Sequence, residues 1–244
     1  FEPFIWGFDD LEAIFFMTLL LLLYFADIPY LGNEVPFYLC RMTRKIWLAG
    51  QVVYIVCATA IYTVAILLST ILICGQRCYV GNIWSETAVK LAFTSAGKKL
   101  SLAASEKTLE LTRPYACMTT IFFLLFAYAL VMVLLIFWFR ILWNELAGMI
   151  AGVVFNGISF IFSPGILQKL LGISERKSYL ANVAAGWISP LSHATYHLHN
   201  FGYDRLPSLR DSGIYDMVLV IMLILLNLYS IRTYHFVFDG TGER

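Results

Sequence analysis

Five long stretches of the chain carry almost no charged residue, and they limit what it can fold into. A helix that crosses the hydrocarbon core of a bilayer needs about 20 mostly apolar residues. Each of the five stretches is close to that length or longer, and has Asp, Glu, Lys or Arg only near its ends. They are Leu11–Tyr30, Ile46–Cys74, Tyr115–Phe139, Leu146–Ser163 and Gly213–Ile231.

The composition agrees with membrane insertion. Of the 244 residues, 60% are hydrophobic and only 14% are charged, whereas a soluble domain carries about 25% charged residues. A soluble domain of this size must cover itself with polar side chains, and this chain has too few of them. The sequence therefore predicts an all-α, polytopic membrane protein in contact with the lipid bilayer, with residues 1–244 forming one transmembrane domain.

Charge and cysteine usage exclude several classes of partner. The net charge of +1 provides no basic field for nucleic acid, and we expect no nucleic-acid partner. The five cysteines are scattered and do not have the spacing of a zinc site. Only Cys74 and Cys78 are close enough in sequence to pair, with two unpaired small hydrophobic side chains as the alternative.

The third and fourth stretches are separated only by residues 140–145, which predicts an antiparallel helical hairpin. Arg140 and Glu145 are expected to form an ion pair in its turn. Gly148 and Gly152 are four residues apart in the fourth stretch, a spacing that predicts close packing against another helix, in this chain or in a second copy.

The connection between the first two stretches is short and basic. Arg41, Arg44 and Lys45 have the i, i+3, i+4 spacing that places side chains on one face of a helix. This pattern predicts an amphipathic helix at the membrane interface, over about residues 33–49.

Two longer polar connections remain. Residues 76–114 mix acidic and basic side chains, which predicts one surface helix ended by Pro114. Residues 164–212 include an uncharged part that is broken by Gly186 and Pro190 and carries three histidines. We expect a pair of short re-entrant helices here, with the turn near Pro190.

Polar residues near the stretches offer few chemical sites. Asp27 and Glu145 lie near span ends, where they serve either ion transfer or helix capping. His193, His197 and His199 form the densest group of metal-capable side chains, but no acidic residue lies between them as a zinc hydrolase motif requires. We therefore predict no catalytic residue, cofactor site or metal site, and expect interfacial histidines at a re-entrant turn.

Two local patterns resemble a known family. Ala26-Asp27-Ile28-Pro29 is an acid-proline step at the end of a span, and Arg41, Arg44 and Trp47 form an Arg-x-x-Arg-x-x-Trp segment leading into the next span. Together with Trp84-Ser85-Glu86, Ser189-Pro190 and Leu206-Pro207-Ser208, these patterns resemble bacterial ABC-type permeases of the type-2 exporter class.

The resemblance implies a specific architecture. It implies six spans, so that the five stretches would be spans two to six and the first would lie in a missing N-terminal segment. It also implies a cytoplasmic coupling helix at about 33–49 that contacts an ATPase through Arg41, Arg44, Lys45 and Trp47. Residues 76–114 and 164–212 would then be extracellular, although the count of Lys and Arg in the loops favours the opposite orientation.

The function implied by the resemblance is the permease subunit of an ABC exporter in the cell membrane, moving a peptide, lipid-like or drug-like substrate outward. ATP hydrolysis needs a G-x-x-x-x-G-K-[ST] loop, and Gly97-Lys98-Lys99-Leu100 lacks the first glycine and the hydroxyl. ATP and Mg²⁺ would therefore bind a separate ATPase subunit, and a second permease would complete the pathway, with the first and fifth stretches at the interface. The alternatives are a self-sufficient secondary transporter or channel using Asp27 or Glu145, and an intramembrane metal hydrolase using the histidines.

Overall fold

The computed structural model describes residues 1–29, 41–75, 81–94, 97, 106–170, 172, 174–202 and 204–234. These residues form helices and short connections, with no strand among them. In chain order the elements are α1 (Glu2–Phe8), α2 (Leu11–Tyr24), α4 (Arg44–Cys74), α5 (Glu86–Phe93), α7 (Glu106–Leu111), α8 (Pro114–Leu142), α9 (Glu145–Ile161), α10 (Pro164–Leu170), η2 (Glu175–Lys177), α11 (Ser178–Ile188), α12 (Pro190–Ala194), η3 (Tyr196–Leu198) and α13 (Leu209–Ser230).

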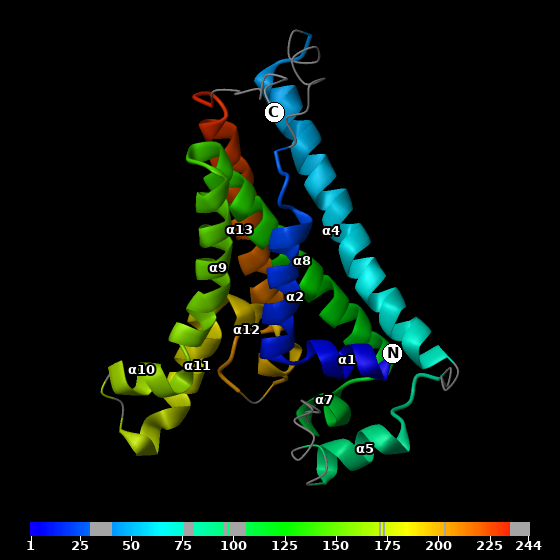
Figure 1. Cartoon of the computed structure of the whole chain (residues 1–244). Helices are drawn as coiled ribbons and strands as arrows, with labels where there is room; N and C mark the ends of the chain where they lie inside the picture. The colour runs from blue at the N-terminus through cyan, green and yellow to red at the C-terminus, as the bar shows by residue number, and fades with distance from the viewer. Residues whose placement is uncertain are drawn as a thin grey trace.

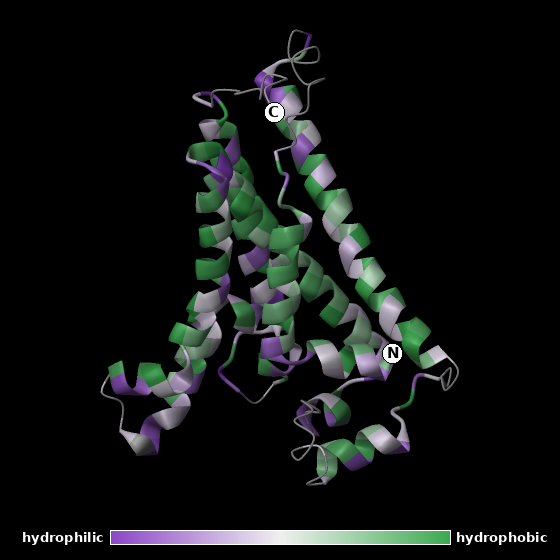
Figure 2. Ribbon diagram, in the orientation of Figure 1, coloured by the Kyte–Doolittle hydropathy of each residue, from purple (hydrophilic) through white to green (hydrophobic). Residues whose placement is uncertain are grey.

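Three helices, α4, α8 and α13, are long and apolar enough to cross a membrane. The pair α9 and α10 meets the same criterion together but is bent by 72° at the break between them. The described residues thus contain three candidate spans, or four if the bent pair counts as one. Apolar residues dominate these helices along most of their length (Figure 2). The all-helical class is confirmed, whereas the predicted five spans are not all present as long helices.

Helix α8 is the centre of the bundle (Figure 1). It packs against α4, α9 and α13 along its length and also against α1, α2 and α12. Its most hydrophobic stretch is 61% buried inside the protein, against 22% for the corresponding stretches of α4 and α13. The outer faces of α4 and α13 are therefore apolar and exposed, as expected of helices that face lipid or a second chain.

Helix α2 is shorter than the predicted stretch Leu11–Tyr30. It holds 14 residues, a rise of about 21 Å, less than the ~30 Å hydrocarbon core. Pro29 cannot continue the helix, and a side chain from α8 binds the carbonyl groups that follow its last turn. The first predicted span is therefore a short apolar helix in the part of the chain that is described.

Helix α4 starts earlier than predicted. The hydroxyl of Thr43 accepts a hydrogen bond from the main-chain N–H of Ile46, which sets the first residue at Arg44. Lys45 also lies in this first turn, whereas Arg41 precedes the cap. The prediction that the three basic residues share one face of a separate helix was wrong. The remainder of the predicted coupling helix, residues 33–40, lies outside the described residues.

The two polar connections also differ in detail from the prediction. The described parts of residues 76–114 include two short helices, α5 and α7, where one was predicted, and Pro114 is the first residue of α8 instead of the end of a surface helix. In the second connection, Ser189 ends α11 and caps α12, so the chain turns next to Pro190 as predicted. The re-entrant position of these helices in a membrane stays a prediction.

The two glycines of α9 permit close helix packing within the chain. A Cβ atom at Gly148 would lie 2.4 Å from Cγ of Arg140 and 2.8 Å from the carbonyl oxygen of Ile136. At Gly152 it would lie 2.8 Å from a methyl carbon of Leu22. These glycines thus let α9 approach α8 and α2. The close packing predicted for them occurs within this chain.

The bundle formed by the described helices has two ends that differ in the elements they hold. One end of the bundle, called here the basic end, holds the start of α4 and the ends of α8 and α13, with Arg41, Arg44, Lys45, Arg140 and Arg232 (Figure 1). The opposite end, called the cap end, holds α1, α5, α7, α10 and α11 (Figure 1).

Arg140 joins α8 to the end of α2 at the basic end. The side chain is 4% exposed, and one guanidinium nitrogen donates to the carbonyl oxygens of Phe25, Ala26 and Ile28. These carbonyl groups have no helical partner. The predicted ion pair with Glu145 does not occur among the described residues.

We predict that Arg140→Leu destabilises the protein by about 3 kcal/mol, because a buried carbonyl group without a partner costs roughly 1–3 kcal/mol. The measurement is thermal unfolding in detergent, where a loss of this size lowers Tm by roughly 6–12 °C. Arg140→Lys should recover part of the loss. Arg113→Leu, at the exposed start of α8, is the matched control, and an equal effect of the two leucine variants would contradict the role of Arg140.

Candidate functional site

Helix α12 is inserted into the bundle near the cap end. All of its residues are buried, and it contacts α2, α8, α9, α11 and α13. The hydroxyl of Ser189 accepts from the N–H of Ser192 at 3.3 Å. The hydroxyl of Ser159, on α9, accepts from the N–H of Leu191 at 3.0 Å. Both bonds satisfy the first N–H groups of a helix that has no water around it.

His193 and His199 meet at one hydroxyl on α13. Nδ1 of His193 and Nε2 of His199 each lie 2.8 Å from Oγ of Ser212. The two imidazoles are 1% and 0% exposed, and the Ser212 side chain is fully buried. The His193 ring also stacks on Tyr215, with centroids 4.2 Å apart. This cluster fixes α12 and η3 to the first turns of α13.

The outer nitrogens of these two rings contact main-chain oxygens. Nε2 of His193 lies 3.2 Å from the carbonyl oxygen of Trp187, and Nδ1 of His199 lies 3.1 Å from that of Tyr196. Burial lowers the pKa of His193, and it lowers the pKa of His199 to about 4. Both rings are therefore neutral near pH 7.

His197 has a different partner. Its main-chain N–H donates to Oδ1 of Asp9 at 2.7 Å, and its ring Nδ1 donates to the main-chain oxygen of Asp9, also at 2.7 Å. Burial lowers the pKa of His197, but the hydrogen bonds and charge of Asp9 outweigh burial and raise it above the ordinary value. Asp9 is 1% exposed, so this pair ties the α1–α2 junction to η3.

The three histidines do not form a metal site. They lie on α12, on η3 and after η3, and His193 and His197 share no helix because α12 ends at Ala194. No group of three or more His, Cys, Asp or Glu side chains in the described ranges could hold a metal ion. The histidines instead act as hydrogen-bonding side chains that dock short helices.

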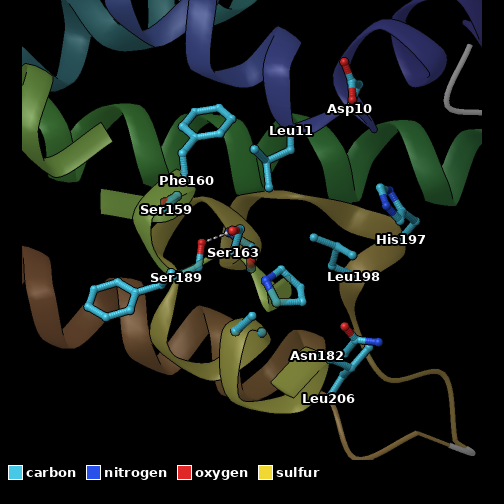
Figure 3. A pocket seen from close by; sticks show the side chains of 15 residues that line it. Asp10, Leu11, Ser159, Phe160, Ser163, Asn182, Ser189, His197, Leu198 and Leu206 are labelled. Carbon is cyan, nitrogen blue, oxygen red and sulfur yellow. Dashed lines mark hydrogen bonds between the residues drawn. The ribbon is translucent and has the colours of Figure 1, made fainter. Parts of the chain in front are cut away.

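A pocket of about 540 Å³ opens beside this cluster. Residues of α9 line it on one side and His197 and Leu198 on the other (Figure 3). Its lining is mainly apolar but includes several hydroxyl and amide groups, contributed by Ser159, Ser163, Asn182, Ser189 and Ser192. An apolar pocket with a few polar groups is the usual form of a small-molecule site.

Several polar groups lie deep in the helices, and the sequence did not single them out as sites. Asp216, on α13, is 3% exposed, and its Oδ2 has no hydrogen-bond partner. Tyr128 on α8 donates to Oδ1 of Asn156 at 2.8 Å, and the amide of Asn156 donates to Thr18 on α2 at 2.9 Å. In the sequence, Asp216 is an isolated acidic residue inside an apolar stretch, and such a residue indicates a functional site.

The carboxylates chosen from the sequence are elsewhere. Asp27 and Glu145 are both exposed at the basic end, away from the buried polar groups. Glu145 lies in the first turn of α9, which is capped by Asn144. Neither position offers a carboxylate enclosed within the bundle.

The proposed coupling residues are all at the basic end but differ in exposure. Arg41 and Lys45 are exposed, whereas Trp47 is 6% exposed and stacks on Tyr234. Arg44 donates to the carbonyl oxygens of Ile231 and Arg232 at 3.3 and 2.6 Å. Cys78 lies outside the described residues, so its pairing with Cys74 stays a prediction.

We predict that Asp9→Asn destabilises the protein by about 1.5–3 kcal/mol, the usual scale for a hydrogen bond to a charged group, and more at pH 5.5 than at pH 9. The raised pKa of His197 means that its stabilising charge is fully present below its ordinary pKa of 6.5 and is lost as pH rises through the raised value. Thermal unfolding at both pH values measures this difference.

Asp204→Asn is the control for this prediction. Asp204 accepts from Lys107 at the same end of the bundle, and that pair contains no histidine. Its loss should lower stability by a similar amount at both pH values. A pH-independent effect of Asp9→Asn would show that the His197 charge does not contribute.

Comparison with known proteins identifies no relative: no family model matches the chain, and no curated protein or solved structure matches it either. The assignment of a function therefore rests on the residues and geometry described above.

Proposed function

We propose that the chain is the permease subunit of an ATP-driven exporter in the cell membrane, powered by a separate ATPase subunit that binds ATP and Mg²⁺. The observation that carries this proposal is the asymmetry of the bundle. Both ends carry exposed basic residues, but among the described residues the bent helix pair, the buried short helices and the pocket before the last long helix lie at one end alone. The sequence motifs point to the same class.

The basic end has the features that a coupling surface needs. Arg41 and Lys45 are exposed and free of the core, so they are placed to contact an acidic surface of a partner. Arg44 binds the end of α13, and Arg140 binds the end of α2. A displacement of the start of α4 would therefore act directly on α13, whose other end lies at the cap end of the bundle.

This arrangement refines the roles of the four predicted residues. Arg41 and Lys45 are the contact residues, Arg44 is a link between two helices, and Trp47 packs inside the protein. The resemblance places this end in the cytoplasm, whereas the count of Lys and Arg in the loops favours the opposite orientation. With this end in the cytoplasm, α10–α12 and the pocket would be extracellular.

The pocket supports a substrate class. Its walls are largely apolar, and its polar groups are hydroxyls, one amide, the His197 ring and the Asp10 carboxylate. Such a lining suits an amphipathic molecule that carries hydroxyl or carbonyl groups on an apolar body. Among the three substrate classes expected from the resemblance, the mainly apolar lining favours lipid-like and drug-like compounds.

One observation favours the alternative of a secondary transporter. Asp216 is a buried carboxylate in a candidate span with an oxygen that lacks a partner, and such residues often take part in ion coupling. Asp27 and Glu145, the residues first considered for this role, are exposed. Only Asp216 among the candidate-span carboxylates thus supports ion coupling in the described part of the chain.

Charge reversal at the basic end tests the exporter proposal. The double variant Arg41→Glu, Lys45→Glu should lower the ATPase activity that co-purifies with the chain roughly tenfold, as expected for a loss of about 1.4 kcal/mol in binding. The double variant Lys90→Glu, Arg205→Glu changes exposed charges at the cap end and should leave that activity unchanged. Equal effects at the two ends would count against a coupling surface.

The predicted second permease can be tested through α13. Its outer face is apolar and formed by Val218, Ile221, Met222, Leu225 and Leu226, and a single bundle of this size encloses no continuous pathway among its described residues. A cysteine at Ile221, which is 52% exposed, should crosslink two copies in membranes when the native cysteines are replaced. A cysteine at Leu223, which is 2% exposed, should not, and monomers in both cases would contradict a self-paired permease.

A further inference from the structure

The hydrogen bonds around Ser212 form a linear chain of four contacts. It runs from the Trp187 carbonyl oxygen through His193, the Ser212 hydroxyl and His199 to the Tyr196 carbonyl oxygen. The contacts measure 3.2, 2.8, 2.8 and 3.1 Å in that order. Both ends are carbonyl groups, which only accept hydrogen bonds.

When both imidazoles are neutral, the four contacts around Ser212 have too few hydrogens. Each outer ring nitrogen must donate to its carbonyl group, and a neutral imidazole has only one N–H. The inner nitrogens of His193 and His199 are then both acceptors facing Ser212. The hydroxyl has a single hydrogen, so three hydrogens must serve four contacts, and one contact is left between two lone pairs.

We propose that His193, Ser212 and His199 form a binding site for a single proton. With one imidazole protonated, its inner N–H donates to Oγ of Ser212, and the hydroxyl donates to the other imidazole. All four contacts then hold a hydrogen, and the added charge is delocalised over two rings joined by one hydroxyl. A charge-assisted hydrogen bond also strengthens the docking of α12 and η3 on α13.

The geometry limits the site to one proton. A second proton would make both inner nitrogens donors to the same oxygen, and the hydroxyl hydrogen would lose its acceptor. Two positive rings would also share one buried hydroxyl, where like charges repel strongly. Independent buried histidines, in contrast, would each take up a proton without regard to the other.

The surroundings contain several ionisable groups. On α13, Asp216 lies one helical turn after Ser212, Tyr215 stacks on His193, and Asp211 lies at the exposed start. Lys107 of α7 donates to the His199 carbonyl oxygen. The other ionisable groups on neighbouring elements are Cys117 and Tyr128 of α8, Tyr196 of η3, and the pair Asp9 and His197. Asp211 directly precedes Ser212, and its negative charge favours the protonated state of His193.

Nitrogen-15 NMR of the full chain in lipid nanodiscs, with labelled histidine, tests the proposal directly. The ring nitrogen shifts distinguish a neutral imidazole from an imidazolium, and His193→Gln and His199→Gln assign the signals. Between pH 8 and pH 4 the pair should take up one proton in total, with both rings changing together. Uptake of two independent protons, or of none, would overturn the proposal.

Variants at the hydroxyl give a second measurement. Ser212→Ala should lower the pKa of the shared proton by about one unit or more, because the protonated state loses two hydrogen bonds and the neutral state loses only one. Ser212→Thr keeps a hydroxyl and should retain the wild-type titration. Ser69→Ala removes an α4 hydroxyl that bonds only within its own helix and should change nothing. If Ser212→Ala does not fold, the wild-type stoichiometry and the Ser212→Thr titration still decide the question, and a Ser212→Ala titration identical to wild type would refute the site.

Discussion

Buried hydrogen-bonding groups inside this bundle have no water to satisfy them, and that constraint determines how its helices are joined. Neither lipid nor an apolar core provides partners, so these groups pair within the protein, with exceptions such as Oδ2 of Asp216. Arg140 on α8 binds the carbonyl groups beyond α2, and Tyr128 on the same helix reaches Asn156 of α9. The arrangement of the short helices depends on such bonds as much as on apolar packing.

The same constraint separates the two ends of the molecule. At the basic end, Arg44 and Arg140 bind helix ends and leave Arg41 and Lys45 exposed. At the cap end, α12 lies among longer helices, and its histidines must bond to whatever faces them. His193 and His199 meet a single hydroxyl, which gives them fewer hydrogens than their contacts need. A mechanical link at one end and a proton-sensitive contact at the other are therefore connected by α13.

Much of the framework was predictable from local sequence. The helices α4, α8 and α13 follow from long uncharged stretches, and the turn next to Pro190 follows from a residue that cannot continue a helix. The predicted site was less accurate, because its contacts join distant residues. His197 binds Asp9, which is 188 residues away, and Arg140 binds the end of α2 instead of its neighbour Glu145. Local spacing contains no information about such partners.

Some errors had a local cause that the sequence contained. Thr43 is a good helix cap, and it places Arg44 and Lys45 inside α4, whereas charge spacing alone suggested a separate helix. Asp216 lies near the start of the fifth uncharged stretch, where charged residues were expected at the membrane edge, yet it is buried one turn beyond Ser212. An isolated acidic residue in an apolar stretch indicates a functional position as strongly as the histidine cluster does.

The central claim is that this chain works with an ATPase subunit, and purification of the intact complex tests it most directly. The tagged chain would be isolated from its native membrane in mild detergent, and the subunits identified and quantified by mass spectrometry. We expect a P-loop protein at an equimolar ratio to the chain, with ATP hydrolysis in the purified complex. A transport-competent preparation that contains this chain without any P-loop protein would contradict the account and favour the secondary transporter.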